Sequence, residues 1–211
     1  ALAWEFAYDG VIYKTLSDNT VETTYGTGNY SGSKTIHAIA KDYDGNTYTV
    51  IGIASNTFRE CYELTSVSIS ESVTYIGGYA FCDCSGLKNV NIPSGITQIE
   101  NYTFSGCYNL SSPIIIPNGV TSIGQRAFSG CNSIPTVTFG NNVTTIGDYA
   151  FSGCKSITEI TMPNGVTKIG TGTFSSCENL KSINLNNNID TIGIKAFADC
   201  SSLETIILPN N

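Results

Sequence analysis

The sequence predicts a right-handed solenoid of the α/β class, in which short coils stack on one another behind an N-terminal cap of β-hairpins. Phenylalanine returns every 23 residues with one step of 24, a cysteine follows each phenylalanine three residues later, and residues 1–50 lack both features. A 23-residue unit cannot bury its own apolar face, so neighbouring units are expected to stack. The phenylalanines are Phe58, Phe81, Phe104, Phe128, Phe151, Phe174 and Phe197.

The first half of each unit predicts a short β-strand. Leu or Ile stands three residues after the cysteine, and an alternating apolar pair such as Val67 and Ile69 follows. This period of two is typical of a strand with one buried face. In-register strands of successive coils lie about 4.8 Å apart, so equivalent side chains are expected to lie directly above one another. The phenylalanines then form one interior column and the cysteines form a second.

The second half of each unit, G-x-x-A-F-x-x-C, is too short for a stable isolated helix. We expect it to form one or two helical or 3₁₀ turns that packing against neighbouring coils stabilises. The extra residue of the 24-residue step falls between Leu110 and Pro113, just before Ile114–Ile116.

Residues 1–50 carry hairpin signals in place of the repeat. Asp9-Gly10 and Asp44-Gly45 each separate two strand-like runs, which predicts two hairpins. Residues 17–19 read as a turn, and residues 26–34 read as a Gly/Ser-rich loop. Ile36 is expected to begin a degenerate first coil, which rejoins the repeat register at Ile53.

The chain therefore divides into a cap over residues 1–50, including the degenerate coil, and an array of about seven repeats over residues 51–211. The chain stops at Pro209-Asn210-Asn211, part-way through a repeat, so we expect the natural protein to continue. An array that is open at its C-terminal edge also permits end-to-end self-association.

Composition excludes several classes of partner. The net charge is −7 and the ten Lys and Arg residues are scattered, so no basic stripe exists for nucleic acid. No apolar run approaches the roughly 20 residues that cross a bilayer, so direct membrane insertion of this segment is not expected. Ala1-Leu2-Ala3 matches the end of an A-x-A cleavage site, which favours an exported, extracellular or cell-surface location.

Catalytic and metal-binding patterns are missing from the sequence. The only histidine is His37, and no nucleophile is paired with it. Cys82 and Cys84 have no second pair at zinc-ligand spacing. We therefore predict no catalytic residue, no metal site and no cofactor, and we do not expect an enzyme.

Seven of the eight cysteines occupy one position of the repeat. Side chains of in-register strands point the same way, so we expect a reduced, buried ladder of thiols rather than disulfides. Cys82 lies outside this position, directly after Phe81. For Cys82 we consider exposure at the surface, with a reactive thiol or an intermolecular bridge as the alternatives to a free, inert thiol.

The complete unit, L-x-x-V-x-I-P-x-x-V-T-x-I-G-x-x-A-F-x-x-C, resembles the BspA-type leucine-rich repeat over residues 53–211. The resemblance implies a leucine-rich-repeat fold, and its N-terminal hairpins look like the cap that precedes such arrays. It also implies an exported bacterial surface protein, with adhesion to host matrix or cell-surface proteins among the family's roles. The asparagine-ladder slot departs from the common pattern, so a continuous ladder is not expected; it holds Ser72, Gly95, Gly119, Asn142, Gly165 and Asn188.

Two surfaces are candidates for binding a partner. The strand face should expose two rows of small, mostly neutral residues, of which we select Ser66, Ser68, Asn89, Asn91, Thr136, Thr138, Glu159, Thr161, Ser182 and Asn184. Pro113, Ile115, Thr205 and Ile207 complete these rows. The alternative is an outer stripe formed by Tyr79, Tyr102, Arg126 and Tyr149. Both surfaces also fit plain solvent-exposed repeat surface.

These observations together predict a non-catalytic protein-binding or adhesion module of an exported bacterial surface protein. A structural spacer in a larger cell-surface protein is the first alternative. A carbohydrate-binding module is the second, and the lack of an aromatic platform on the strand face argues against it.

Overall fold

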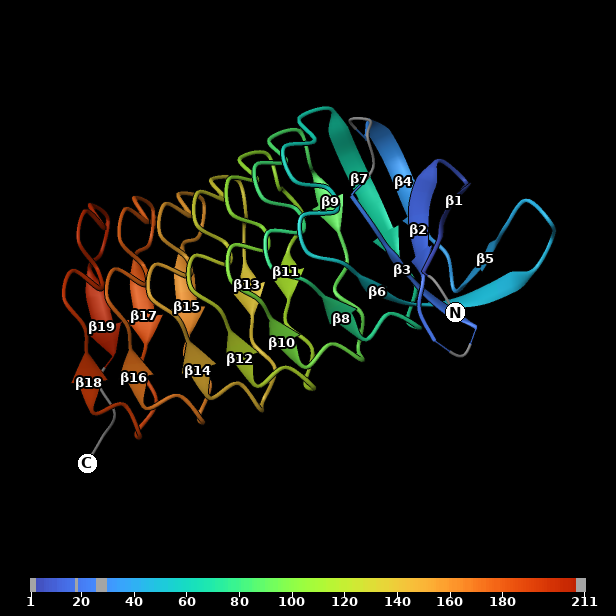
Figure 1. Cartoon of the computed structure of the whole chain (residues 1–211). Coiled ribbons are helices and arrows are strands. Elements are labelled where there is room, and N and C mark those ends of the chain that lie inside the picture. The colour runs from blue at the N-terminus through green and yellow to red at the C-terminus, as the bar shows by residue number, and fades with distance from the viewer. Residues whose placement is uncertain (1–2, 18, 26–29, 208–211) are drawn as a thin grey trace.

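The computed structural model describes residues 3–17, 19–25 and 30–207, and these residues form a continuous stack of coils (Figure 1). Within these ranges every regular element is a short β-strand, and none is a helix. Most strands of the coils pair in parallel with the equivalent strands of neighbouring coils, as Gln98 does with Ser122 and Ile99 with Ile123. This pairing confirms the predicted stacking and the 23- to 24-residue register.

Each coil contributes two strands, where the sequence predicted one. The first-strand column consists of β4 (Gly32–Ile36), β7 (Leu64–Ile69), β9 (Asn89–Val90), β11 (Ile114–Ile115), β13 (Val137–Thr138), β15 (Glu159–Thr161), β17 (Ser182–Asn184) and β19 (Thr205–Ile207). The second-strand column consists of β6 (Thr47–Ile53), β8 (Tyr75–Ile76), β10 (Gln98–Ile99), β12 (Ser122–Ile123), β14 (Thr145–Ile146), β16 (Lys168–Ile169) and β18 (Thr191–Ile192). The second strand comes from the V-T-x-I-G segment, for which no strand was predicted.

The G-x-x-A-F-x-x-C segment forms turns but no regular helix. Alternate N–H groups bond three residues back, as Ala80 does to Gly77, and the N–H groups between them bond to the next coil. In one coil Tyr79, Phe81 and Asp83 donate to Asn101, Thr103 and Ser105 of the next coil, over 2.7–3.1 Å. These N–H groups are therefore not available for intrahelical bonds. Two residues per coil adopt left-handed backbone angles to make this arrangement, with φ between 55° and 77°. They precede the A-F or T-F pair (Asn56, Tyr79, Tyr102, Arg126, Tyr149, Gly172, Lys195) and the cysteine (Glu60, Asp83, Gly106, Gly130, Gly153, Ser176, Asp199).

The phenylalanine column is confirmed. Consecutive rings from Phe58 to Phe197 stack with centroids 5.1–5.9 Å apart and planes within 3–11° of parallel. The first six are fully buried, and Phe197 in the last coil is half-buried. Tyr30 of the cap covers the first ring, with its centroid 4.8 Å from that of Phe58. Burying each phenylalanine contributes roughly 1.5–3 kcal/mol, so the column is a principal source of stability.

The cysteine column beside it is reduced, as predicted, since all eight thiols are free. Each Sγ–H from Cys84 onwards donates to the carbonyl oxygen of the phenylalanine one coil earlier. Examples are Cys131 to Phe104, over 3.1 Å, and Cys154 to Phe128, over 3.2 Å. The repeated cysteine is thus a small buried hydrophobe that also bonds adjacent coils together.

The first hairpin of the cap is confirmed. β1 (Glu5–Tyr8) and β2 (Val11–Thr15) pair antiparallel around Asp9 and Gly10, whose φ values of 48° and 70° are those of a type I′ turn. β3 (Thr20–Thr23) follows, antiparallel to β2 and parallel to β6. The predicted turn before β3 includes residue 18, which lies outside the described residues.

The second hairpin is also confirmed, and joins β5 (Ile39–Lys41) to β6. The buried Asp42 fixes its turn by accepting bonds of 2.8–3.1 Å from the N–H groups of Asp44 and Asn46, the Asn46 amide and the Tyr48 hydroxyl. Burial tends to raise the pKa of this carboxyl, but the bonds from Asn46, Tyr48 and Asp44 prevail and hold the pKa below its usual value.

The degenerate first coil differs in detail from the prediction. Ile36 pairs with Ile69 and ends the first strand of this coil rather than beginning it. Residues 32–34 of the predicted loop belong to β4, whereas residues 26–29 lie outside the described part of the chain. Ile53 pairs with Ile76, so the register resumes where predicted. Because β6 runs across residue 50, the cap and the array share a strand, and the domain division at this residue stays a prediction.

The asparagine ladder is interrupted, as predicted. Asn142 and Asn188 each donate an amide bond of 2.8 Å to the preceding coil, and Ser72 donates through its hydroxyl over 2.7 Å. Glycines occupy the slots between them and have no side chain to donate.

Candidate strand-face binding site

The ten selected strand-face residues lie together along the first-strand column. Eight of them are exposed, and Ser66 and Ser182 are half-exposed. Alternate residues of the same strands, such as Val90, Ile160 and Ile183, are buried in the core. The period-two reading therefore placed each side chain on the correct face, while the role of this face in binding stays a prediction.

The ladder of the first-strand column is broken twice. β4, β7 and β9 form one parallel sheet, β11 and β13 a second, and β15, β17 and β19 a third. No pairing joins β9 to β11 or β13 to β15 among the described residues. The first break coincides with the extra residue before Pro113, where Ser111 and Ser112 both donate to the carbonyl of Lys88.

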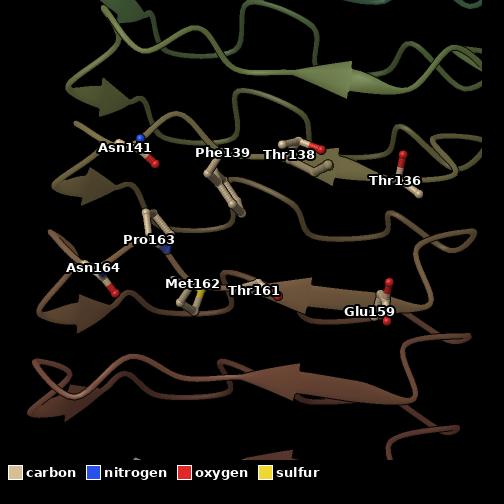
Figure 2. A pocket seen from close by; sticks show the side chains of 10 residues that line it. Thr136, Thr138, Phe139, Asn141, Glu159, Thr161, Met162, Pro163 and Asn164 are labelled. Carbon is tan, nitrogen blue, oxygen red and sulfur yellow. The ribbon is translucent and has the colours of Figure 1, made fainter.

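The second break coincides with Phe139. The equivalent position of other coils holds Ile92, Ile116, Met162 or Leu185, which are smaller or unbranched. The Phe139 ring packs edge-on against Phe151, with centroids 5.7 Å apart and planes at 89°. It remains half-exposed between the two strands (Figure 2).

A surface opening lies at each break. The β9/β11 opening has a volume of about 390 Å³ and is lined by Glu71, Val90, Asn91, Ile92, Ser94, Pro113, Ile114, Ile115 and Pro117. The β13/β15 opening has a volume of about 500 Å³ and is lined by Thr136, Val137, Thr138, Phe139, Asn141, Glu159, Thr161, Met162, Pro163 and Asn164 (Figure 2). Most of the lining residues occupy equivalent repeat positions two coils apart, but the carboxylates Glu71 and Glu159 are not equivalent to each other.

The two openings share one chemistry. Each combines apolar side chains, Ile92 with Ile115 or Phe139 with Met162, with neutral amide and hydroxyl groups. Each also has one carboxylate, and neither is lined by Lys or Arg. In the first opening Glu71 accepts bonds of 2.8 and 2.7 Å from the N–H and hydroxyl of Ser94, which hold its pKa below the usual value.

The sequence analysis missed the turn residues of this site. Asn141 and Asn164 line the β13/β15 opening from the turns after the strands. Asn187 and Asn188 line a neighbouring cavity of about 510 Å³, which also includes Thr161, Met162 and Asn184. Of these turns only that of Asn164 carries a Pro-Asn-Gly signal, at residues 163–165, and this signal does not indicate that the turn borders the strand face. Ile115 was noted as a member of its row, and its side chain is 66% exposed among polar neighbours.

The four residues of the alternative tyrosine stripe form two stacked pairs. The rings of Tyr79 and Tyr102 are parallel with centroids 4.7 Å apart, and Arg126 lies 4.8 Å from the centre of Tyr149. Arg59, which the sequence analysis did not include, lies 5.6 Å from the centre of the Tyr79 ring. The four predicted residues are all half-buried, so much of their aromatic and cationic surface is used within the stripe.

The prediction that Cys82 is exposed at the surface is wrong. Its side chain is buried, and its Sγ–H points to Asp83 Oδ2 at 3.5 Å. Burial, together with the nearby carboxylate of Asp83, raises the pKa of this thiol to about 12. Cys82 is therefore protonated at neutral pH and is not an activated nucleophile.

His37 is held by the cap. Its Nε2 lies 2.8 Å from Asp9 Oδ2, and its ring packs edge-on against Tyr8. Within the described residues no three His, Cys, Asp or Glu side chains gather as metal ligands. No helix in the described part of the chain is long and apolar enough to cross a membrane.

Parallel coils with a recurring L-x-x-V-x-I strand and an exposed strand face define a leucine-rich-repeat protein. The chain belongs to the BspA-type leucine-rich repeat family, whose model matches residues 51–115 and 111–211 in six copies. Proteins built on this type of repeat are typically non-catalytic and generally mediate protein–protein interactions. No curated protein matches the chain.

Solved bacterial structures share the fold. A leucine-rich repeat protein from Bacteroides ovatus is 35% identical with a TM-score of 0.88, over 98% of this chain. The chain spans about half of that protein, 54% of its length. The leucine-rich repeat protein of T. pallidum is 30% identical with a TM-score of 0.78, over 94% of this chain and 87% of that one. A leucine-rich cell surface protein from Faecalibacterium prausnitzii is 25% identical with a TM-score of 0.55, over 99% and 77%.

Proposed function

We propose that the chain is a non-catalytic protein-binding module of an exported bacterial surface protein, and that it binds a host matrix or cell-surface protein through the strand face. The observation that carries the proposal is the pair of openings at the two breaks of the first-strand column, on a face of small, mostly exposed residues. Where two neighbouring strands do not pair, apolar side chains between them become accessible, and a partner can cover them. The F. prausnitzii relative is a cell surface protein, which supports export.

The strand face is preferred over the tyrosine stripe for one reason. Tyr and Arg are frequent anchors of protein interfaces. In this stripe, however, Tyr79 and Tyr102 stack on each other and Arg126 stacks on Tyr149. In the openings Ile115 and Phe139 have exposed surface that a partner could bury.

A binding assay with matched variants tests the proposal. Purified extracellular-matrix proteins and fixed epithelial cells are probed with the wild-type chain, with Thr138→Arg/Thr161→Arg on the strand face, and with Tyr79→Ser/Tyr149→Ser on the stripe. Strand-face binding predicts loss of binding with the first pair only. Loss with the second pair only would place the interface on the stripe, and equal behaviour of all three proteins would favour the structural spacer.

A further inference from the structure

Building on the proposed function, we infer that the two openings together bind one peptide segment in the polyproline II conformation. One apolar or prolyl side chain enters each opening, and a basic residue of the segment pairs with Glu159. The partner is thus an extended, proline-containing and basic stretch of a protein.

The spacing of the two openings matches the side-chain repeat of a polyproline II helix. The openings are two coils apart, and the stacked rings of Phe104, Phe128 and Phe151 in the core are separated by 5.2 and 5.3 Å, so the stack advances roughly 10 Å from one opening to the next. A polyproline II helix has three residues per turn and rises about 3.1 Å per residue, which brings side chains i and i+3 to the same side about 9 Å apart. In a β-strand the same-side repeat is only about 6.6 Å.

The polar groups of the openings favour a polyproline II segment over an α-helix. An α-helix also repeats at roughly 10 Å, over seven residues, but its backbone groups are bonded internally. Polyproline II has no internal hydrogen bonds, so its carbonyl groups remain available as acceptors. The exposed amides of Asn141 and Asn164 border the β13/β15 opening and can donate to such carbonyls, whereas the amide of Asn91 already donates to the carbonyl of Ile69 over 2.8 Å. A helix would cover these amides without pairing them, which is unfavourable.

The charge of the openings favours a basic peptide segment. Glu71 and Glu159 are the only charged residues that line the two openings. Glu71 is already bonded to Ser94. Glu159 is exposed and forms no ion pair with any residue in the described ranges. The chain as a whole carries a net charge of −7, so a basic segment is favoured over an acidic one.

Fluorescence anisotropy with synthetic labelled peptides tests the inference. The probe is R-P-L-P-P-L-P, in which the two leucines are three residues apart. The comparison peptides are R-P-L-P-P-G-L-P, which shifts the spacing by one residue, E-P-L-P-P-L-P, which reverses the charge, and a helical peptide with leucines seven residues apart. We expect saturable binding of the probe and at least about tenfold weaker binding of each comparison peptide, a difference of about 1.4 kcal/mol.

Matched variants locate the binding. Thr161→Arg fills the β13/β15 opening, whereas Thr167→Arg introduces the same side chain at an exposed threonine that lies outside both openings and outside the strand-face rows. Glu159→Gln removes the proposed charge partner, and Glu178→Gln is its control, since Glu178 pairs with Lys155 over 2.7 Å outside both openings. Each test variant should weaken probe binding about tenfold or more, and each control should leave it unchanged. Unaltered thermal unfolding verifies that each variant is folded.

Three results would overturn the inference: no saturation by the probe at millimolar concentration, equal binding of the shifted or helical peptide, or equal losses in Thr161→Arg and Thr167→Arg. Failure of the peptide together with strand-face-dependent binding of matrix proteins would reject only the polyproline II ligand. Failure of both assays would reject the proposed function as well.

Discussion

The two sides of each coil hold the stack together in different ways. The G-x-x-A-F-x-x-C segments form one corner of each coil, the Phe/Cys corner. There the rings stack without a break from Phe58 to Phe197, and N–H and S–H donors bond neighbouring coils. On the first-strand column the ladder is broken twice and each break leaves an opening. The corner therefore maintains the stack, and the strand face can lose pairing at two coils without separating them.

The largest effect should come from the centre of the corner. Phe128→Ala removes a fully buried ring that stacks on Phe104 and Phe151, and should lower the free energy of unfolding by about 3–5 kcal/mol. Urea denaturation followed by circular dichroism measures it. Phe197→Ala, at a half-buried ring with one stacked neighbour, should cost less; an equal loss at both positions would contradict a stabilising role for continuous stacking.

A second, smaller effect on stability is expected at the cysteine column. Two substitutions of one cysteine distinguish the contribution of its buried volume from that of its hydrogen bond. Cys131→Ala leaves a cavity and removes the donor to Phe104, whereas Cys131→Ser keeps a donor at the same carbonyl. We expect Cys131→Ala to be the less stable variant by about 1 kcal/mol, the usual net contribution of one hydrogen bond. Chemical denaturation of both variants measures the difference. The reverse order would mean that the cysteine contributes only as a hydrophobe.

A pH-dependent effect should come from the strand face. The bonds from Ser94 lower the pKa of Glu71 in the folded state, so this carboxylate stabilises the fold above its ordinary pKa. The contribution is lost as the pH falls through the lowered folded-state value. Unfolding in urea between pH 6 and pH 3 should therefore show a shallower acid-side loss for Glu71→Gln than for wild type. Identical pH profiles would show that the Ser94 bonds do not favour the ionised form.

The smallest effect should come from the rim of the β9/β11 opening. Ile115→Asn introduces the residue that Asn91 and Asn184 supply at equivalent positions, at a side chain that is 66% exposed. The free energy of unfolding should change by no more than about 0.5 kcal/mol. A loss comparable to that of Phe128→Ala would remove the contrast between the two sides of the coil.

The sequence alone determined the features that depend on repetition. Phenylalanine and cysteine at a fixed period can be buried only when coils stack, so both columns, the register and the exposure of alternate strand residues such as Asn91 and Thr138 were predictable. Asp9-Gly10 and Asp44-Gly45 likewise determined two hairpins through local backbone preference. These features follow from period, polarity and turn chemistry, which a single chain displays directly.

Tertiary structure decided the features that depend on bonds between coils. The corner forms no helix because N–H groups such as that of Phe81 bond to the next coil, and Cys82 is buried by packing that its own neighbours in the sequence do not reveal. The two openings depend on how Pro113 and Phe139 fit against adjacent coils. A repeat pattern states which residues are equivalent, but whether two equivalent strands pair depends on the distance between their backbones, and only the assembled stack sets that distance.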